Sequence, residues 1–229
     1  MKNPLKLINY DLLSKKVYRI LKKEIIKGSF TPGSKILEFQ IAQQMGISRT
    51  PVREAIRLLA AEGFVVLSPN QGALVRTVSV ENIKEVLQIH SVLEGLAARL
   101  ACEVINKDGL EELENYLNKM ENLLKAGDSV AYSEVDLKFH DTIVNACRNS
   151  RLIKMRKNIS DQAQRYRISS LRVAKRLRKS FAEHRKIFEA FKERDSNKAD
   201  RMSQKHIQNA LKNILKKVIE KENNGPSVA

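Results

Sequence analysis

The sequence predicts a mainly α-helical protein with two domains, at residues 1–78 and 79–229. Apolar residues recur at intervals of three and four through most of the chain, which is the helical period. The one clear pair of β-branched segments joined by a turn, "FVVLSPNQGALVRTV", lies at residues 64–78 and predicts a hairpin. With 229 residues, 42% of them hydrophobic, the chain is long enough for two small domains with separate cores.

The first domain begins with a helix from about Leu12 to Lys27. An apolar residue recurs in it every four positions, at Leu13, Val17, Leu21 and Ile25. A Pro-Gly turn at 32–33 separates it from a second helix over roughly 37–45. Gly46 then permits a sharp bend, because glycine adopts positive φ without steric cost.

A third helix is expected at residues 50–62. Ser48 or Thr50 can cap its start. Positions four apart advance only about 40° around a helix, so three arginines share one side of it: Arg49, Arg53 and Arg57. The neighbouring arc carries apolar residues that can pack against the first two helices: Val52, Ile56 and Leu59.

This arrangement is a helix-turn-helix, and the hairpin adds a wing. Arg49 lies at a helix N-terminus, where free amides favour a phosphate, and an arginine fork can bind guanine in the major groove. The wing tip is uncharged, so Asn70, Gln71 or backbone amides are expected to touch the duplex. The net charge of +16 fits a polyanionic partner. A solvated basic face is the alternative for the arginine row.

The second domain is expected to be an all-α bundle, because few alternating β-branched runs remain. Its helices are predicted at 80–105, 109–126, 129–148, 151–170, 181–194 and 197–221. Asp108 with Glu111, and Ser180 with Glu183, match the spacing of a capping box.

Four potential metal ligands lie on three of these helices. Asp136 and His140 are four apart and share one face. His184 lies on an apolar, inward face, and His206 on a weakly apolar one. Helical bundles build metal sites in this way, and a three-histidine, one-aspartate set suits Zn²⁺, Ni²⁺ or Mn²⁺. Taken singly, a histidine on an apolar face is more often a hydrogen-bonded core residue than a metal ligand.

These residues resemble a known family. "GISRTPVREAIRLLAAEGFV" is similar to the signature of GntR-type bacterial transcription regulators, with a match over residues 12–76. The helical remainder resembles the FCD-type ligand-binding domain of the FadR subfamily, in its metal-binding version. The resemblance implies that Arg49 and Arg53 contact operator DNA, that Thr50 contacts a phosphate and that Gly72 lies in the wing. It also matches four positions to metal ligands: Asp136, His140, His184 and His206.

Three features depart from the family pattern or leave alternatives open. Phe39, preceded by Glu38, stands where many members carry an arginine. His90 lies near the position at which family members often carry an arginine that faces the ligand pocket. It is therefore either a pocket residue or an exposed one. Residues 148–179 hold 12 basic residues against Asp161 alone. This block is a solvated face, a source of effector-binding arginines such as Arg165 and Arg167, or a DNA contact.

We therefore expect a ligand-responsive transcription regulator. Helix 50–62 recognises a double-stranded operator, and the helical domain binds a divalent transition metal and a small organic acid that modulates DNA affinity. A palindromic operator requires a homodimer. The alternative is a metal-dependent hydrolase or isomerase with a basic tethering domain. No general base is clearly placed for it, and no GxSxG or HExxH motif occurs.

Cellular location follows from composition. Cys102 and Cys147 are far apart and form no CxxC, which favours a reducing, cytoplasmic setting. No signal peptide or membrane-spanning segment is predicted, and no membrane partner is expected.

Overall fold

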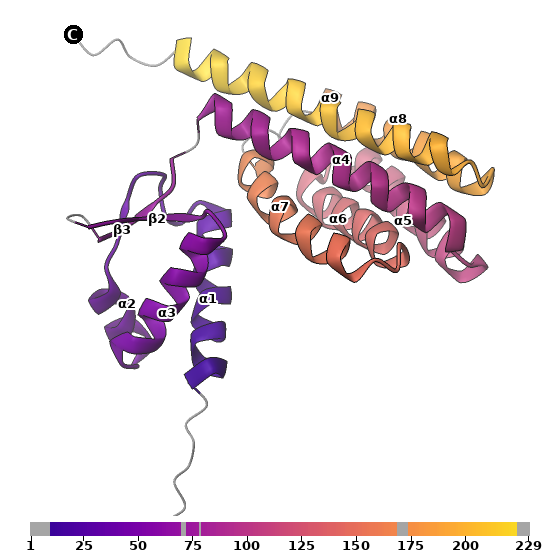
Figure 1. The fold of residues 1–229 in the computed structure, drawn as a ribbon. Coiled ribbons are helices and arrows are strands. Elements are labelled where there is room, and N and C mark those ends of the chain that lie inside the picture. The colour runs from indigo at the N-terminus through magenta and orange to yellow at the C-terminus, as the bar shows by residue number, and fades with distance from the viewer. Residues whose placement is uncertain (1–9, 70–71, 78, 169–173, 224–229) are drawn as a thin grey trace, which may run out of the picture. The chain divides into compact units, whose positions relative to one another are not determined.

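The structure, a computed structural model of the chain, describes residues 10–69, 72–77, 79–168 and 174–223. The chain divides into two compact units, Met1–Val78 and Ser79–Ala229. The first contains three helices and a small sheet, and the second is a helical bundle (Figure 1). The predicted fold class is confirmed. No helix of the described segments is long and apolar enough to cross a membrane.

The first unit packs three helices against an antiparallel sheet. Its helices are α1 (Tyr10–Lys27), α2 (Glu38–Met45) and α3 (Arg49–Ala61). The predicted hairpin is formed by β2 (Val65–Ser68) and β3 (Gly72–Val75), and β1 (Lys35–Ile36) adds a short edge strand that the sequence did not indicate. The core joins α1, α3 and the sheet through Val17, Leu21, Val52, Ile56, Leu59 and Val65.

Gly46 makes the bend between α2 and α3. Its φ of 63° lies in the left-handed region, and its N–H donates to carbonyls of the last turn of α2. Ser48 stands at the N-cap position of α3 with an extended backbone, but its side chain makes no capping hydrogen bond. The expected side-chain cap is therefore absent from this described helix start.

The described residues of the second unit form six helices around one core. They are α4 (Val80–Val104), α5 (Lys107–Ala126), α6 (Ser129–Ala146), α7 (Ser150–Ile168), α8 (Ala174–Lys192) and α9 (Ser196–Asn223). α4 and α9 lie side by side (Figure 1). Gly95 permits this approach, because a Cβ there would clash with Asp200 and Gln204 of α9.

Both predicted capping boxes are wrong. α5 is capped two residues before Asp108, by Asn106, whose side chain accepts from the Gly109 N–H at 3.0 Å. α8 begins at Ala174 rather than near 181, so Ser180 is a buried residue inside the helix. Glu183 therefore has no helix end to cap, and its carboxylate instead interacts with His206 and Asn209 of α9.

Candidate nucleic-acid interface and metal centre

α3 exposes its arginines on the side that core packing leaves open. The apolar arc of the helix is buried, with Val52, Ile56 and Leu59 at 2% exposure or less. The side chains of Arg49, Arg53 and Arg57 are 60%, 49% and 62% exposed. Ser48 and Thr50, at the start of the helix, are also exposed. The exposed side of α3 therefore offers three guanidinium groups and two hydroxyls to a partner.

Glu38 of α2 holds two of these arginines. Arg53 donates to its carboxylate from Nε at 3.2 Å and from Nη2 at 3.1 Å. Arg49 Nη2 lies 3.7 Å from the same carboxylate. The hydrogen bonds that Arg53 donates to Glu38 raise the pKa of Arg53 above its ordinary value. Glu38 therefore orients the guanidinium of Arg53 and lies within ion-pairing distance of Arg49.

A shallow groove of about 550 Å³ lies between α2, α3 and the sheet, and the two arginines line it. Phe39, Leu67 and Gly72 line it as well. Gly72 opens β3 with a φ of 79°, a conformation that suits glycine. Asn70 and Gln71, predicted for the wing tip, lie outside the described residues.

Four buried side chains from α6, α8 and α9 converge in the helical unit. Asp136, His140, His184 and His206 are each at most 3% exposed. One potential ligand atom of each lies within 4.8 Å of those of the others. His184 Nε2 is 3.1 Å from His140 Nε2 and 3.1 Å from Asp136 Oδ1. This cluster could hold a metal ion.

The hydrogen bonds around the cluster fit a metal. His206 directs Nδ1 at Glu183 Oε2, 2.8 Å away, and His140 directs Nδ1 at Glu94 Oε2, 3.4 Å away. A neutral imidazole that donates from Nδ1 keeps its lone pair on Nε2. The Nε2 lone pairs of His140 and His206 are therefore available to the centre of the cluster, as a bound cation requires.

Glu183 forms one outer support of the cluster. Besides His206, it accepts from Asn209 Nδ2 at 3.0 Å and from Arg176 Nη1 at 3.1 Å. Burial alone would raise the pKa of Glu183, but the His206 hydrogen bond and the Arg176 charge lower it. Burial also lowers the pKa of His206, against the effect of Glu183. Both shifts favour a charged carboxylate beside a neutral, metal-competent imidazole.

Glu94 forms the second support and is 2% exposed. Its Oε1 accepts from Arg156 Nε at 2.6 Å and lies 3.1 Å from His90 Nε2. Arg156 also donates to Asp141 at 2.6 Å. Burial alone would raise the pKa of Glu94, but the charge of Arg156 and the hydrogen bonds of His140 and His90 hold it well below its usual range. Glu94 is thus a buried anion that joins α4 to α6 and α7.

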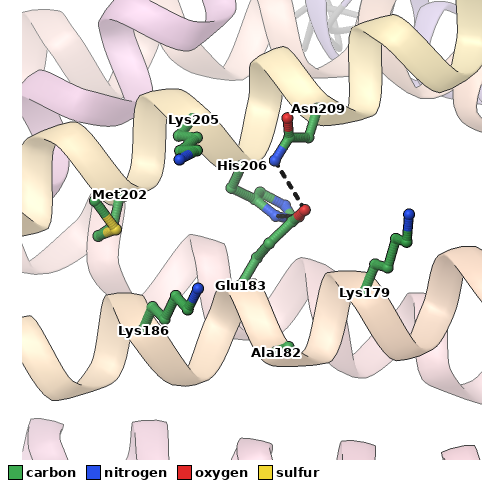
Figure 2. Close-up of a pocket in the computed structure, with 8 residues that line it drawn as sticks. All are labelled: Lys179, Ala182, Glu183, Lys186, Met202, Lys205, His206 and Asn209. Atoms are coloured by element: carbon green, nitrogen blue, oxygen red, sulfur yellow. Dashed lines mark hydrogen bonds and ion pairs between the residues drawn. The ribbon is translucent and has the colours of Figure 1, made fainter.

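A groove of about 240 Å³ between α8 and α9 reaches the back of this cluster. Figure 2 shows Glu183 and His206 in it, with lysine side chains of both helices around them. The lysines are Lys179, Lys186 and Lys205. Within the described residues none of the three forms an ion pair, so the groove holds three lysine charges beside the carboxylate of Glu183.

Comparison with known proteins identifies the family. Residues 13–75 match the bacterial regulatory proteins of the gntR family, and residues 85–209 match the FCD domain. The chain is 31% identical over 209 residues to the uncharacterized HTH-type transcriptional regulator YdhC of Bacillus subtilis (strain 168), covering 90% of this chain and 93% of that protein. This chain is a GntR-family transcription regulator with an FCD domain.

Other relatives of this GntR-family regulator have assigned roles. The HTH-type transcriptional repressor RspR of Escherichia coli (strain K12) is 24% identical, over 88% of this chain and 89% of its own length. The gluconate operon transcriptional repressor of Bacillus subtilis (strain 168) is 27% identical, over 74% and 68%. The solved structure of E. coli McbR/YncC has the same fold, with a TM-score of 0.76 at 23% identity over 90% and 98% of the two chains. The relatives are transcription regulators, so the hydrolase or isomerase alternative is set aside.

The remaining predicted residues have mixed placements. His90 is buried, with 3% of its surface exposed, and lies beside Glu94. The alternative that His90 is an exposed residue is therefore wrong. Burial lowers its pKa. The side chains of Arg165 and Arg167 lie outside the described residues. The basic block has a use that the sequence did not indicate, because its Arg156 and Arg176 neutralise the two carboxylates that support the metal cluster.

Sequence reasoning missed Glu94, Arg156 and Glu183. A helical spacing of four between His90 and Glu94 was the only local signal for the first. Arg156 is 62 residues away from Glu94 in sequence, and no local pattern joins them. Glu183 was assigned to a helix cap although it directly precedes His184.

Proposed function

We propose that this GntR-family regulator recognises operator DNA with the exposed side of α3 and that the FCD domain adjusts its affinity. Arg49, Arg53 and Arg57 contact phosphates and guanine edges, and Ser48 and Thr50 bind phosphates at the helix start. Gly72 and the wing tip at Asn70 and Gln71 contact the adjacent groove. The observation that carries this proposal is the division of α3 into a buried apolar arc and an exposed cationic side.

The cluster Asp136, His140, His184 and His206 binds a divalent transition metal in this proposal. The support is the donor set, with two Nε2 lone pairs fixed by Glu94 and Glu183. Three imidazoles and a carboxylate suit Zn²⁺, Ni²⁺ or Mn²⁺. When bound, the metal supplies positive charge and open coordination positions for an oxygen ligand.

The effector is a small organic acid. The lysine-lined groove between α8 and α9 supports an anionic ligand, and His206 belongs both to this groove and to the metal cluster. His90, Arg165 and Arg167 remain candidates for the same role. Such a ligand changes operator affinity only by binding the two conformations of the regulator unequally.

A homodimer presents two recognition helices to a palindromic operator. The exposed face of α4 supports self-association, because Ile89, Val92 and Leu96 are 50%, 56% and 37% exposed there. Glu85 and Arg99 lie seven positions before and after Val92. In the described structure neither forms an ion pair, and two α4 helices crossing antiparallel at Val92 bring Glu85 of each near Arg99 of the other.

Fluorescence anisotropy with duplexes that flank the protein's own gene tests the proposal. The wild type is expected to bind one duplex specifically, with an affinity that falls steeply as salt rises. Arg53→Ala is expected to lose specific binding and keep the helical circular dichroism spectrum. Lys212→Ala, which removes one positive charge from an exposed position of α9, serves as the control. Unchanged operator affinity in Arg53→Ala contradicts the assignment of α3.

A further inference from the structure

An exposed aromatic side chain lines the groove that contains Arg49 and Arg53. Phe39, in the first turn of α2, is 62% exposed. It lines the same groove as Arg49, Arg53 and Leu67 of β2, which is 52% exposed. Exposed phenyl and isobutyl groups in one groove with guanidinium groups form a mixed apolar and cationic surface, which suits a polyanion that also carries apolar groups.

The neighbouring acid does not prevent an anion from approaching Phe39. Glu38 precedes it, but its carboxylate is engaged by Arg53 at 3.1 Å and faces Arg49 at 3.7 Å. Lys35 adds another positive charge to the groove. The surroundings of the phenyl ring therefore carry a net positive charge, as a duplex-binding surface requires.

A duplex major groove offers one compact apolar group at its base edges, the C5 methyl of thymine. Phe39 lines one groove with the two arginines that contact DNA in the proposed function, on which this inference rests. We propose that Phe39 is a specificity-determining residue that packs on a thymine methyl group of the operator. The regulator then combines arginine contacts to phosphate or guanine with an apolar contact to thymine.

The test begins with the full-length protein and a pool of random duplexes, from which its preferred operator is selected. Each thymine of that operator is then replaced in turn by deoxyuridine, which removes only the methyl group. For the wild type we expect one thymine in each half-site at which the replacement weakens binding about fourfold, the effect of burying one methyl-sized group. Phe39→Ala is expected to weaken binding to the thymine operator and to be indifferent to the replacement there.

Leu12→Ala is the matched control, because Leu12 is an equally exposed apolar residue (64%) of the same unit, on α1. It should retain the full methyl effect. Thermal melting checks that both variants fold. A wild type without methyl dependence at any thymine overturns the inference, as does a Phe39→Ala variant that keeps the dependence. Binding lost equally with and without the methyl group indicates that the ring packs on deoxyribose, which also overturns it. Failure to select any duplex contradicts the proposed function itself.

Discussion

Replacing Glu94 by glutamine tests the buried support of the metal cluster. The substitution keeps the shape of the side chain and removes a charge that is 2% exposed and lies 2.6 Å from Arg156 Nε. Breaking a buried ion pair by removing one partner costs about 3–5 kcal/mol, because the other charge stays buried. Arg156 retains Asp141, whose side chain is 57% exposed, so the cost should lie near the lower end, at roughly 3 kcal/mol.

The assay is thermal unfolding of the metal-free protein, followed by circular dichroism. For a domain of about 150 residues, 1 kcal/mol shifts Tm by roughly 2–4 °C, so Glu94→Gln should lower the Tm of the FCD domain by roughly 6–12 °C. Glu103→Gln, at an exposed position of the same helix, should stay within about 0.5 kcal/mol of the wild type.

A double-mutant cycle isolates the pair. Arg156→Met alone leaves Glu94 buried without its guanidinium partner, so the double variant Glu94→Gln/Arg156→Met should cost less than the sum of the two single changes, with a coupling of about 0.5–3 kcal/mol. A Glu94→Gln variant that melts within about 2 °C of the wild type, or strictly additive costs, would refute the argument that this ion pair stabilises the bundle.

Three further predictions concern the metal, the protein interface and pH. Glu183→Gln should lower metal affinity about 10–100-fold in a chelator competition, because His206 loses its anionic acceptor. The control Glu189→Gln, at an exposed position of the same helix, should keep the wild-type affinity, and equal affinities of the two variants would contradict the prediction. Val92→Glu on α4 should turn a dimer into a monomer by light scattering, whereas exposed Val130→Glu on α6 should leave it dimeric; a persistent dimer would exclude the α4 face. Burial lowers the pKa of His90 and His206, so the unfolded chain takes up more protons than the folded protein as pH falls through about 6.5. The free energy of unfolding of the metal-free protein, measured with urea, should therefore decrease from pH 7.5 to pH 5.5. A flat profile would contradict this.

Local patterns were sufficient for the helices other than the first part of α8, and for the arginines of α3. Gly46 and the apolar arc of α3 locate the bend and the buried side without any long-range information. The spacing of Asp136 and His140 places both on one face, and the inward faces of His184 and His206 follow from their apolar neighbours.

Long-range contacts account for what the sequence did not reveal. β1 has only two residues and is a strand because it pairs with β3, a partner more than thirty positions away. The start of α8 was missed because "AKRLRKS" is dominated by basic residues. Of these seven residues, Leu177 and Ser180 are buried, and two positions are too few to indicate a buried helix face. Glu94 and Arg156 meet only in the folded bundle, so neither could be recognised as a support of the metal cluster.

The pairing of Glu38 with Arg53 has a consequence for how the protein searches a genome. In the proposed function, a backbone phosphate that binds the Nε–Nη2 edge of this guanidinium competes with a carboxylate that already occupies two of its five N–H groups. Random sequence offers only phosphates in exchange and gains little, while a correct site adds base contacts that repay the exchange. An intramolecular competitor of this kind shortens residence at wrong sites and so preserves the speed of one-dimensional diffusion along the chromosome.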